Sequence, residues 1–210
     1  MRLSSPAYRL PGSFVSWLLF TFSFTGLFQT SGVVLSLGGS CASGTPYVED
    51  VVCPESVVLF APLGIFGMLI AVGIGLFFAR SFGPPLVLWA WPILFVGLGV
   101  QFFAGATAGQ GIVVNIILGG FFIVMGAVPL WWSIRTGVQP FILGMANIEA
   151  QPYSYEDAGR KSHWAPTRPE GEQVPPTPRD WTLAIAIIVV GTGLGAYLSV
   201  LAFNAVAAAG

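Results

Sequence analysis

Residues 57–79 read VVLFAPLGIFGMLIAVGIGLFFA, and this stretch decides the class of the fold. It contains no Asp, Glu, Lys, Arg or His, and Arg80 follows it directly. A helix needs about 20 apolar residues to cross the hydrocarbon core of a bilayer, so the stretch is long enough to span a membrane. It has no polar side to turn toward water, which indicates that lipid surrounds it.

Four other stretches have the same character, and none of them contains a charged residue or His. They cover residues 14–37, 86–104, 111–132 and 181–206. Of all residues in the chain, 55% are hydrophobic and 8% are charged, whereas soluble domains carry about a quarter charged residues. The sequence therefore predicts an all-α membrane protein built as a bundle of five transmembrane helices. The first stretch is longer than the apolar part of a signal peptide, so we expect it to be a retained helix.

The Lys and Arg residues predict the topology. The chain has 8 of them, and all lie in alternate connections between the predicted spans. They are Arg2, Arg9, Arg80, Arg135, Arg160, Lys161, Arg168 and Arg179. Basic residues near the ends of spans stay in the cytoplasm. We therefore expect a multi-pass protein of a bacterial plasma membrane, with a cytoplasmic N-terminus and an extracytoplasmic C-terminus. Most Trp residues, including Trp17, fall near the predicted cytoplasmic ends, where indoles favour the headgroup level.

The sequence divides into three parts. Residues 1–132 form a four-helix transmembrane region with an outer loop at 38–55, and residues 133–180 form a cytoplasmic loop. From about residue 151 this loop is polar and rich in Pro, so we expect it to be disordered. Residues 181–210 supply the fifth helix and a short outer tail.

Cys41 and Cys53 lie in the same predicted outer loop. Thiols outside a bacterial membrane tend to be oxidised, so we expect the two to form a disulfide. A structural bridge is favoured over a catalytic redox pair, because redox-active pairs usually have the spacing Cys-x-x-Cys and an activating neighbour.

Polar residues inside the predicted spans are few. Gln29, Gln101 and Asn115 fall in the outer halves of three spans and could meet at one depth as a polar cluster. Hydrogen bonding between helices is the favoured interpretation, and a ligand site is the alternative. Proton and ion relays usually need buried charged side chains or His, which the spans lack.

Small residues recur at four-residue spacing in two spans. Gly67, Ala71 and Gly75 share one face of the second span. The same spacing places three residues on one face of the fifth span, namely Gly191, Gly195 and Ser199. Such helix-packing stripes let backbones approach closely, either within the bundle, which is favoured, or against a partner subunit or second copy.

The sequence indicates no cofactor and no metal site. Glu49, Asp50 and Glu55 in the outer loop lack a regular ligand spacing for calcium. His163 is the only His, which leaves too few ligands for an ordinary zinc site. The net charge of -1 gives no argument for a nucleic-acid partner.

The outer loop also carries a more distinctive pattern, GGSCASGxPY at residues 38–47 followed by Cys53-Pro54. It resembles the loop of a family of small actinobacterial integral membrane proteins that is functionally uncharacterised. The resemblance covers mainly residues 14–104. It implies the same topology and a disulfide in the loop, and it implies no activity.

Three functions compete at this point. The first is a non-enzymatic accessory or interaction subunit, whose partners are the lipid bilayer and either another membrane protein or a second copy. The second is a small transporter or channel, which needs a continuous polar path. The third is a thiol-redox membrane enzyme, which needs a reactive Cys. We expect the first, and hence no enzymatic activity.

Overall fold

Five long helices make up almost all of the described protein. The structure is a computed structural model that describes residues 6–37, 41, 51–78, 86–107, 111–136, 142 and 178–209. The helices are α1 (Pro6–Ser36), α2 (Glu55–Phe78), α3 (Leu86–Thr107), α4 (Ile112–Thr136) and α6 (Pro178–Ala209). Each is long and apolar enough to cross a membrane. The predicted all-α bundle of five transmembrane helices is confirmed.

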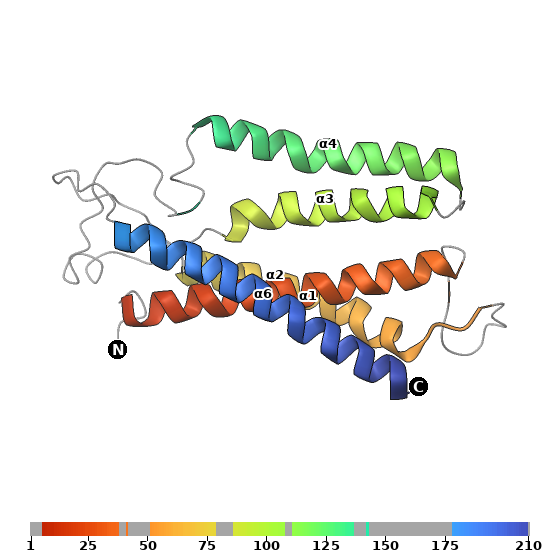
Figure 1. Cartoon of the computed structure of the whole chain (residues 1–210), viewed down its shortest axis with the longest axis horizontal. Coiled ribbons are helices and arrows are strands. Elements are labelled where there is room, and N and C mark those ends of the chain that lie inside the picture. The colour runs from red at the N-terminus through yellow and green to blue at the C-terminus, as the bar shows by residue number, and fades with distance from the viewer. Residues whose placement is uncertain are drawn as a thin grey trace.

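Consecutive helices run in opposite directions, so the two ends of the chain lie at opposite ends of the bundle (Figure 1). A disulfide between Cys41 and Cys53 lies where α1 ends and α2 begins. We call this the disulfide end, and the opposite one the N-terminal end. The chain is therefore a multi-pass membrane protein, and the cytoplasmic location of the N-terminal end stays a prediction from the positions of the basic residues.

The helix α1 is the centre of the bundle. It packs against α2 and α6 along its length and against α3 more narrowly. The main neighbour of α4 is α3, and no other described helix shares a sizeable contact with α4. Figure 1 shows α4 and α3 as successive layers on one side of the group formed by α1, α2 and α6, which overlap in this view. One helix, α4, stands at the edge.

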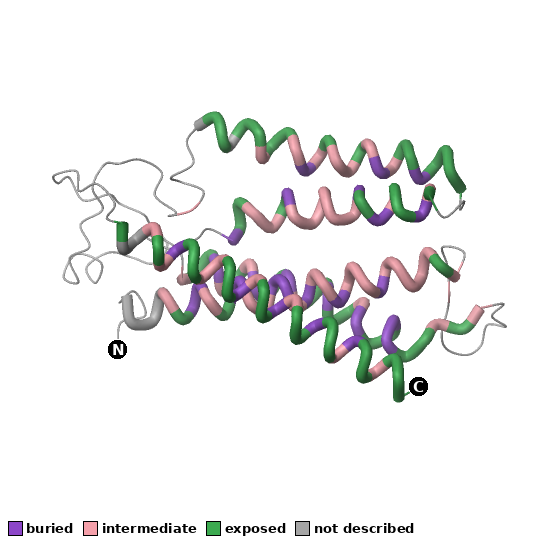
Figure 2. Tube along the Cα trace, in the orientation of Figure 1, coloured by how far each residue is buried: buried purple, intermediate pink, exposed green. Residues whose placement is uncertain are grey.

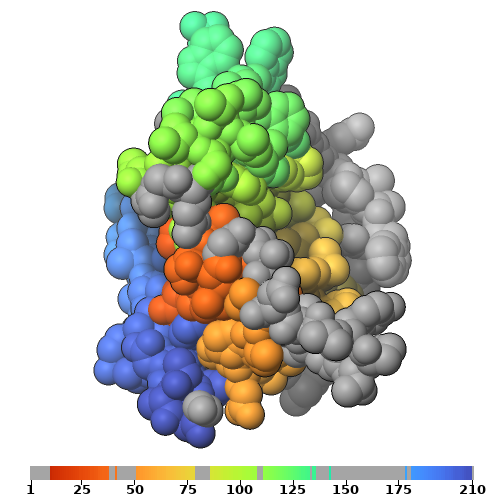
Figure 3. Space-filling view, turned by 90° about the vertical axis from the view of Figure 1, so that its right-hand side faces the viewer, coloured from red at the N-terminus to blue at the C-terminus, as the bar shows by residue number. Residues whose placement is uncertain are grey.

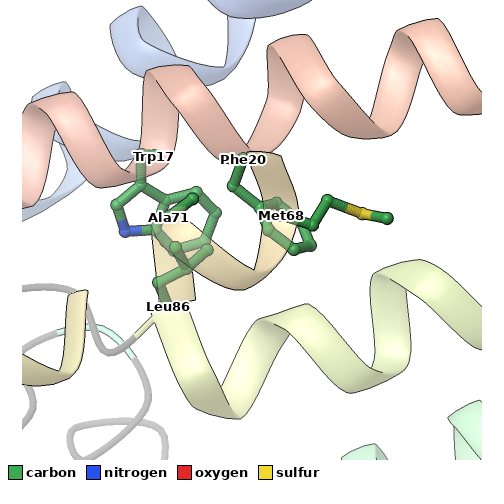
Figure 4. Packing of buried hydrophobic residues seen from close by; sticks show 5 residues of the cluster. All are labelled: Trp17, Phe20, Met68, Ala71 and Leu86. Carbon is green, nitrogen blue, oxygen red and sulfur yellow. The ribbon is translucent and has the colours of Figure 1, made fainter. Parts of the chain in front are cut away.

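The apolar core lies between α1, α2 and α3. Trp17 and Phe20 of α1 point toward Met68 and Ala71 of α2 and toward Leu86 of α3 (Figure 4). Trp17 is only 2% exposed, so its indole is buried between the helices. It lies about three turns inside α1, because this helix begins at Pro6, well before the predicted start of the span. Its place at the headgroup level stays a prediction.

Several helices extend beyond the predicted spans. The helix α1 begins at Pro6 rather than residue 14, α4 continues to Thr136, and α6 begins at Pro178. An apolar run marks only the part of a helix inside the hydrocarbon, whereas the helix itself can continue through the headgroup layer. The prediction of a disordered segment from about residue 151 lies outside the described residues, as does most of the predicted cytoplasmic loop.

Candidate functional site

Buried hydroxyl groups occur along the length of α1. Ser13, Ser16, Thr21, Ser23 and Thr30 are each at most 5% exposed. The Ser16 hydroxyl donates to the carbonyl oxygen of Ser13 at 2.8 Å, and the Thr21 hydroxyl donates to that of Trp17 at 2.8 Å. Thr21 also lies 3.3 Å from the carbonyl oxygen of Gly191 in α6. Because the surroundings of a transmembrane bundle are apolar, its polar side chains are placed inside.

Glycines of α2 and α6 lie against two of these hydroxyls, on opposite sides of α1. A Cβ atom at Gly67 of α2 would collide with the Ser23 hydroxyl. A Cβ atom at Gly195 of α6 would collide with the Thr21 hydroxyl and with the carbonyl oxygen of Leu18. At these points the helices are in direct contact, which leaves no room for water between them.

Both small-residue stripes therefore face α1. In α2, Ala71 is 0% exposed, and Gly75 lies beside Ser16 of α1 and Leu86 of α3. In α6, Gly191 lies against Trp17, and Ser199 is 0% exposed. Since α1 covers both stripes, neither is free to receive a helix of another protein.

Gln101 joins α3 to α1. Its amide nitrogen donates to the carbonyl oxygen of Phe28 at 2.6 Å, and its side chain lies over Gly32 one turn further along α1. Gln101 is 9% exposed. This hydrogen bond crosses the narrow contact between α1 and α3, so it ties the edge pair α3 and α4 to the rest of the bundle.

The other two residues of the predicted polar cluster lie at different contacts. Asn115 of α4 is 8% exposed and lies over Gly105 of α3. Gly105 follows Gln101 by one helical turn, so Asn115 and Gln101 occupy successive levels of α3. Gln29 of α1 buries its side-chain oxygen without a hydrogen-bond partner among the described residues. Gln101 and Asn115 thus lie at helix contacts near the disulfide end, and no hydrogen bond links Gln29 to either of them among the described residues.

A hydrogen bond that the sequence analysis did not predict joins α3 to α4. The indole nitrogen of Trp91 donates to the carbonyl oxygen of Met125 at 3.1 Å. Pro129 lies four residues after Met125 inside α4 and has no N–H to donate to that carbonyl. Trp91 therefore supplies the donor that Pro129 lacks. Because no water in the hydrocarbon can replace a missing donor, the Met125 carbonyl would be left unsatisfied without this hydrogen bond, at a cost in stability.

At the disulfide end, Cys41 and Cys53 are bonded to each other with Cα atoms 5.0 Å apart. No Cys of the chain is free. Glu55 lies two residues beyond Cys53, in the first turn of α2. Glu49 and Asp50 lie outside the described residues. Within the described part of the chain, no group of three His, Cys, Asp or Glu side chains is placed to hold a metal ion.

A groove of about 540 Å³ runs along the outer side of α2 from the disulfide end. Its described lining residues are Cys53, Glu55, Val58, Leu59, Pro62, Leu63 and Phe66. Apart from Cys53 these residues follow the spacing of a single helical face. Phe66, the lining residue farthest along α2 from the disulfide, is 63% exposed, so the groove is shallow and open to the surroundings.

The outward side of α4 has no neighbouring helix among the described residues. Figure 2 shows that exposed and half-buried residues predominate along this helix. We define the α4 outer face as residues that recur at three- or four-residue spacing, namely Val113, Ile117, Gly120, Val124, Val128 and Trp131. Nothing lies within 4 Å of the position that a Cβ atom of Gly120 would take. Figure 3 shows α4 at the edge of the molecule, on the side opposite α6.

At the N-terminal end of the bundle, where α4 finishes, an aromatic residue of the α4 outer face lies next to a basic residue. The guanidinium of Arg135 lies 4.0 Å from the ring centre of Trp131, one turn away. This is a cation–π contact, and it brings the positive charge of the last turn of α4 next to an indole. Trp with Arg is typical of the level of lipid headgroups.

Comparison of the chain with protein-family models, with curated proteins and with solved structures found no match.

Sequence reasoning missed three features of the candidate site. These are the bond from Trp91 to Met125, the open position at Gly120 and the groove along α2. Pro62 and Pro129 inside apolar spans were the available signal, because each removes a donor from its helix. Which contact replaces that donor depends on the order of the helices, and uniformly apolar spans do not encode that order in their periodicity.

Proposed function

We propose that the protein is a non-enzymatic accessory or interaction subunit of a membrane complex, and that it binds a transmembrane helix of another protein on the α4 outer face. The observation that carries this proposal is the isolation of α4, whose main neighbour is α3 alone. By contrast, α2, α3 and α6 all pack against α1. A helix at the edge with one neighbour has the surface to accept a second.

Gly120 places a small residue on this face, and small residues are typical of helix contacts in membranes. Small residues let the backbones of two helices approach closely, and close approach drives association where lipid and protein are equally apolar. Within the bundle, Gly119 and Gly126 of α4 already meet α3 in this way. Gly120 leaves the same kind of open position on the other side of the helix.

Two observations weigh against the alternatives. A transporter needs a polar path, but the hydroxyls of Ser23 and Thr21 are each covered by direct contact with a neighbouring helix, at Gly67 of α2 and at Gly195 of α6. A thiol-redox enzyme needs a reactive Cys, and both Cys residues are bonded to each other. We also propose that the protein lies in a bacterial plasma membrane and that it is related to the small actinobacterial membrane proteins that its outer loop resembles.

The test compares two leucine variants of the tagged protein, solubilised in a mild detergent from its native membrane. Gly120→Leu closes the open position on α4. Gly193→Leu is the matched control, because Gly193 of α6 is also exposed with nothing within 4 Å of its Cβ position. We expect a stoichiometric membrane partner to copurify with the wild type and with Gly193→Leu and to be lost with Gly120→Leu. Equal recovery with both variants would contradict the proposal.

A further inference from the structure

Ile142 attaches the connection between α4 and α6 to the bundle. It packs against Ala184 of α6, together with Leu10 of α1 and Trp181 of α6. We call this contact the Ile142 anchor. Ala184 is 0% exposed, and it precedes Gly191 by seven residues, which is two helical turns. It therefore lies on the side of α6 that faces α1, at the N-terminal end of the bundle.

The anchor lies across the bundle from α4, although the chain reaches it soon after α4 ends. The last residue of α4 is Thr136, six residues before Ile142. Six residues span at most about 22 Å. Neighbouring helices pack with their axes about 8 to 10 Å apart, so the path from α4 past α3 to α1 measures about 16 to 20 Å. While the anchor is bound, the connection has little length to spare, and the end of α4 stays close to α1 and α6.

The anchor restrains a helix that has few other attachments. The main neighbour of α4 is α3, and the contact of α3 with α1 is much narrower than its contact with α4. Toward the disulfide end, the hydrogen bond from Gln101 to the carbonyl oxygen of Phe28 ties α3 to α1. The Ile142 anchor adds an attachment at the N-terminal end that acts on α4 directly.

The anchor is weak enough to be reversible. Ile142 is half-buried, so it gains only part of the free energy of a fully buried side chain. Holding its backbone in one conformation costs a comparable amount of free energy. Because these opposing contributions are similar in size, both the bound and the released state are populated. Release leaves the five membrane-spanning helices unchanged, since Ile142 lies outside all of them.

We propose that the Ile142 anchor fixes the position of α4 and thereby holds the α4 outer face in place for the partner helix. Bound at Ala184, Ile142 limits the movement of α4 relative to α1 and α6. A surface that is already held in place loses less freedom when a partner binds, so it binds more tightly. Release of the anchor weakens partner binding, and by linkage a bound partner favours the bound anchor. This effect on the partner rests on the proposed function of α4, whereas the restraint of α4 does not.

Spin labels measure the restraint in the full-length protein without any partner. Cys41 and Cys53 are bonded to each other, so labels attach only to introduced Cys residues. Ile134→Cys on α4 and Ile185→Cys on α6 replace side chains that are 47% and 45% exposed. Pulsed electron spin resonance gives the distribution of distances between the two labels. We expect Ile142→Ser to widen this distribution at least twofold and Ile142→Leu to leave it unchanged, because Leu keeps an apolar side chain of the same size.

A second pair of labels separates release of the anchor from a general loosening of the bundle. Leu76→Cys on α2 replaces a side chain that is 51% exposed near the N-terminal end, and it is paired with the same label at position 185. The anchor does not act on α2, so Ile142→Ser should leave this distribution unchanged. Equal widths for Ile142→Ser and Ile142→Leu in the first pair, or equal widening in both pairs, overturns the restraint of α4.

Copurification of the membrane partner tests the effect on the α4 outer face. We expect at least threefold less partner with Ile142→Ser than with Ile142→Leu. Equal recovery of the partner, together with a widened distance distribution, overturns the effect on binding. If the wild type brings no partner at all, the proposed function of α4 fails, and the spin labels still decide whether the anchor restrains α4.

Discussion

The indole nitrogen of Trp91 lies 3.1 Å from the carbonyl oxygen of Met125, a carbonyl whose own helix has no donor for it because residue 129 is Pro. This contact joins α4 to α3, which is its main neighbour. The carbonyl that Pro129 leaves without a backbone donor in α4 thus forms a hydrogen bond to α3.

The first prediction tests this relationship with a double-mutant cycle. Trp91→Phe removes the donor and should lower the free energy of unfolding by about 0.6 to 1.7 kcal/mol, the range for hydrogen bonds between transmembrane helices. Pro129→Ala supplies a backbone N–H to Met125, so the same Trp91→Phe change should cost less in that background. Unfolding in mixed detergent micelles measures both. Equal costs in the two backgrounds would refute the link between Trp91 and Pro129.

The second prediction concerns the contact between α6 and α1. Gly195→Ala places a Cβ atom against the Thr21 hydroxyl and the Leu18 carbonyl, and overpacking of this kind costs about 1 to 3 kcal/mol. Gly193→Ala, two residues away with open space around it, should leave stability unchanged or slightly raised, because Ala favours helix over Gly. Thermal unfolding of the two variants in one detergent separates them, and a loss of similar size in both would count against close packing at Gly195.

A third pair of variants compares two glutamines. Gln101→Met removes the hydrogen bond to the Phe28 carbonyl and should lower the free energy of unfolding by about 0.6 kcal/mol. Gln29→Met should cost nothing or be stabilising, because the buried side-chain oxygen of Gln29 has no partner among the described residues. Chemical unfolding curves decide between the two. The opposite order of stability would mean that the attachment of α3 to α1 depends on Gln29.

The fourth prediction concerns the disulfide. Replacing both Cys41 and Cys53 by Ser should lower the free energy of unfolding by about 3 kcal/mol, the chain-entropy value for a loop of this size. Partner binding on α4 should remain in the folded fraction, because the bridge lies between α1 and α2. Unfolding and copurification are measured on the same preparation. A double variant of unchanged stability that loses a thiol-dependent activity would instead support a redox enzyme.

The sequence was sufficient for the class of the fold, because apolar runs long enough for a bilayer leave few alternatives. The pairing of Cys41 with Cys53 also agrees with expectation. The central place of α1 was not predictable in this way, since it depends on contacts such as Ser23 with Gly67 that the sequence does not pair. The burial of Trp17 in the core was not predictable for a related reason, because an apolar run does not show which neighbours its side chains contact.

The central claim is that the α4 outer face binds a helix of another membrane protein. The most direct measurement is photo-cross-linking in intact cells from a photoreactive residue at position 117 on α4, compared with position 189 on α6. Ile117 is 64% exposed and Val189 is 63% exposed, so the two positions differ in location and not in accessibility. We predict a discrete adduct with one other membrane protein from position 117 and none from position 189. Adducts with lipid alone from position 117, or the same protein adduct from both positions, would contradict the account.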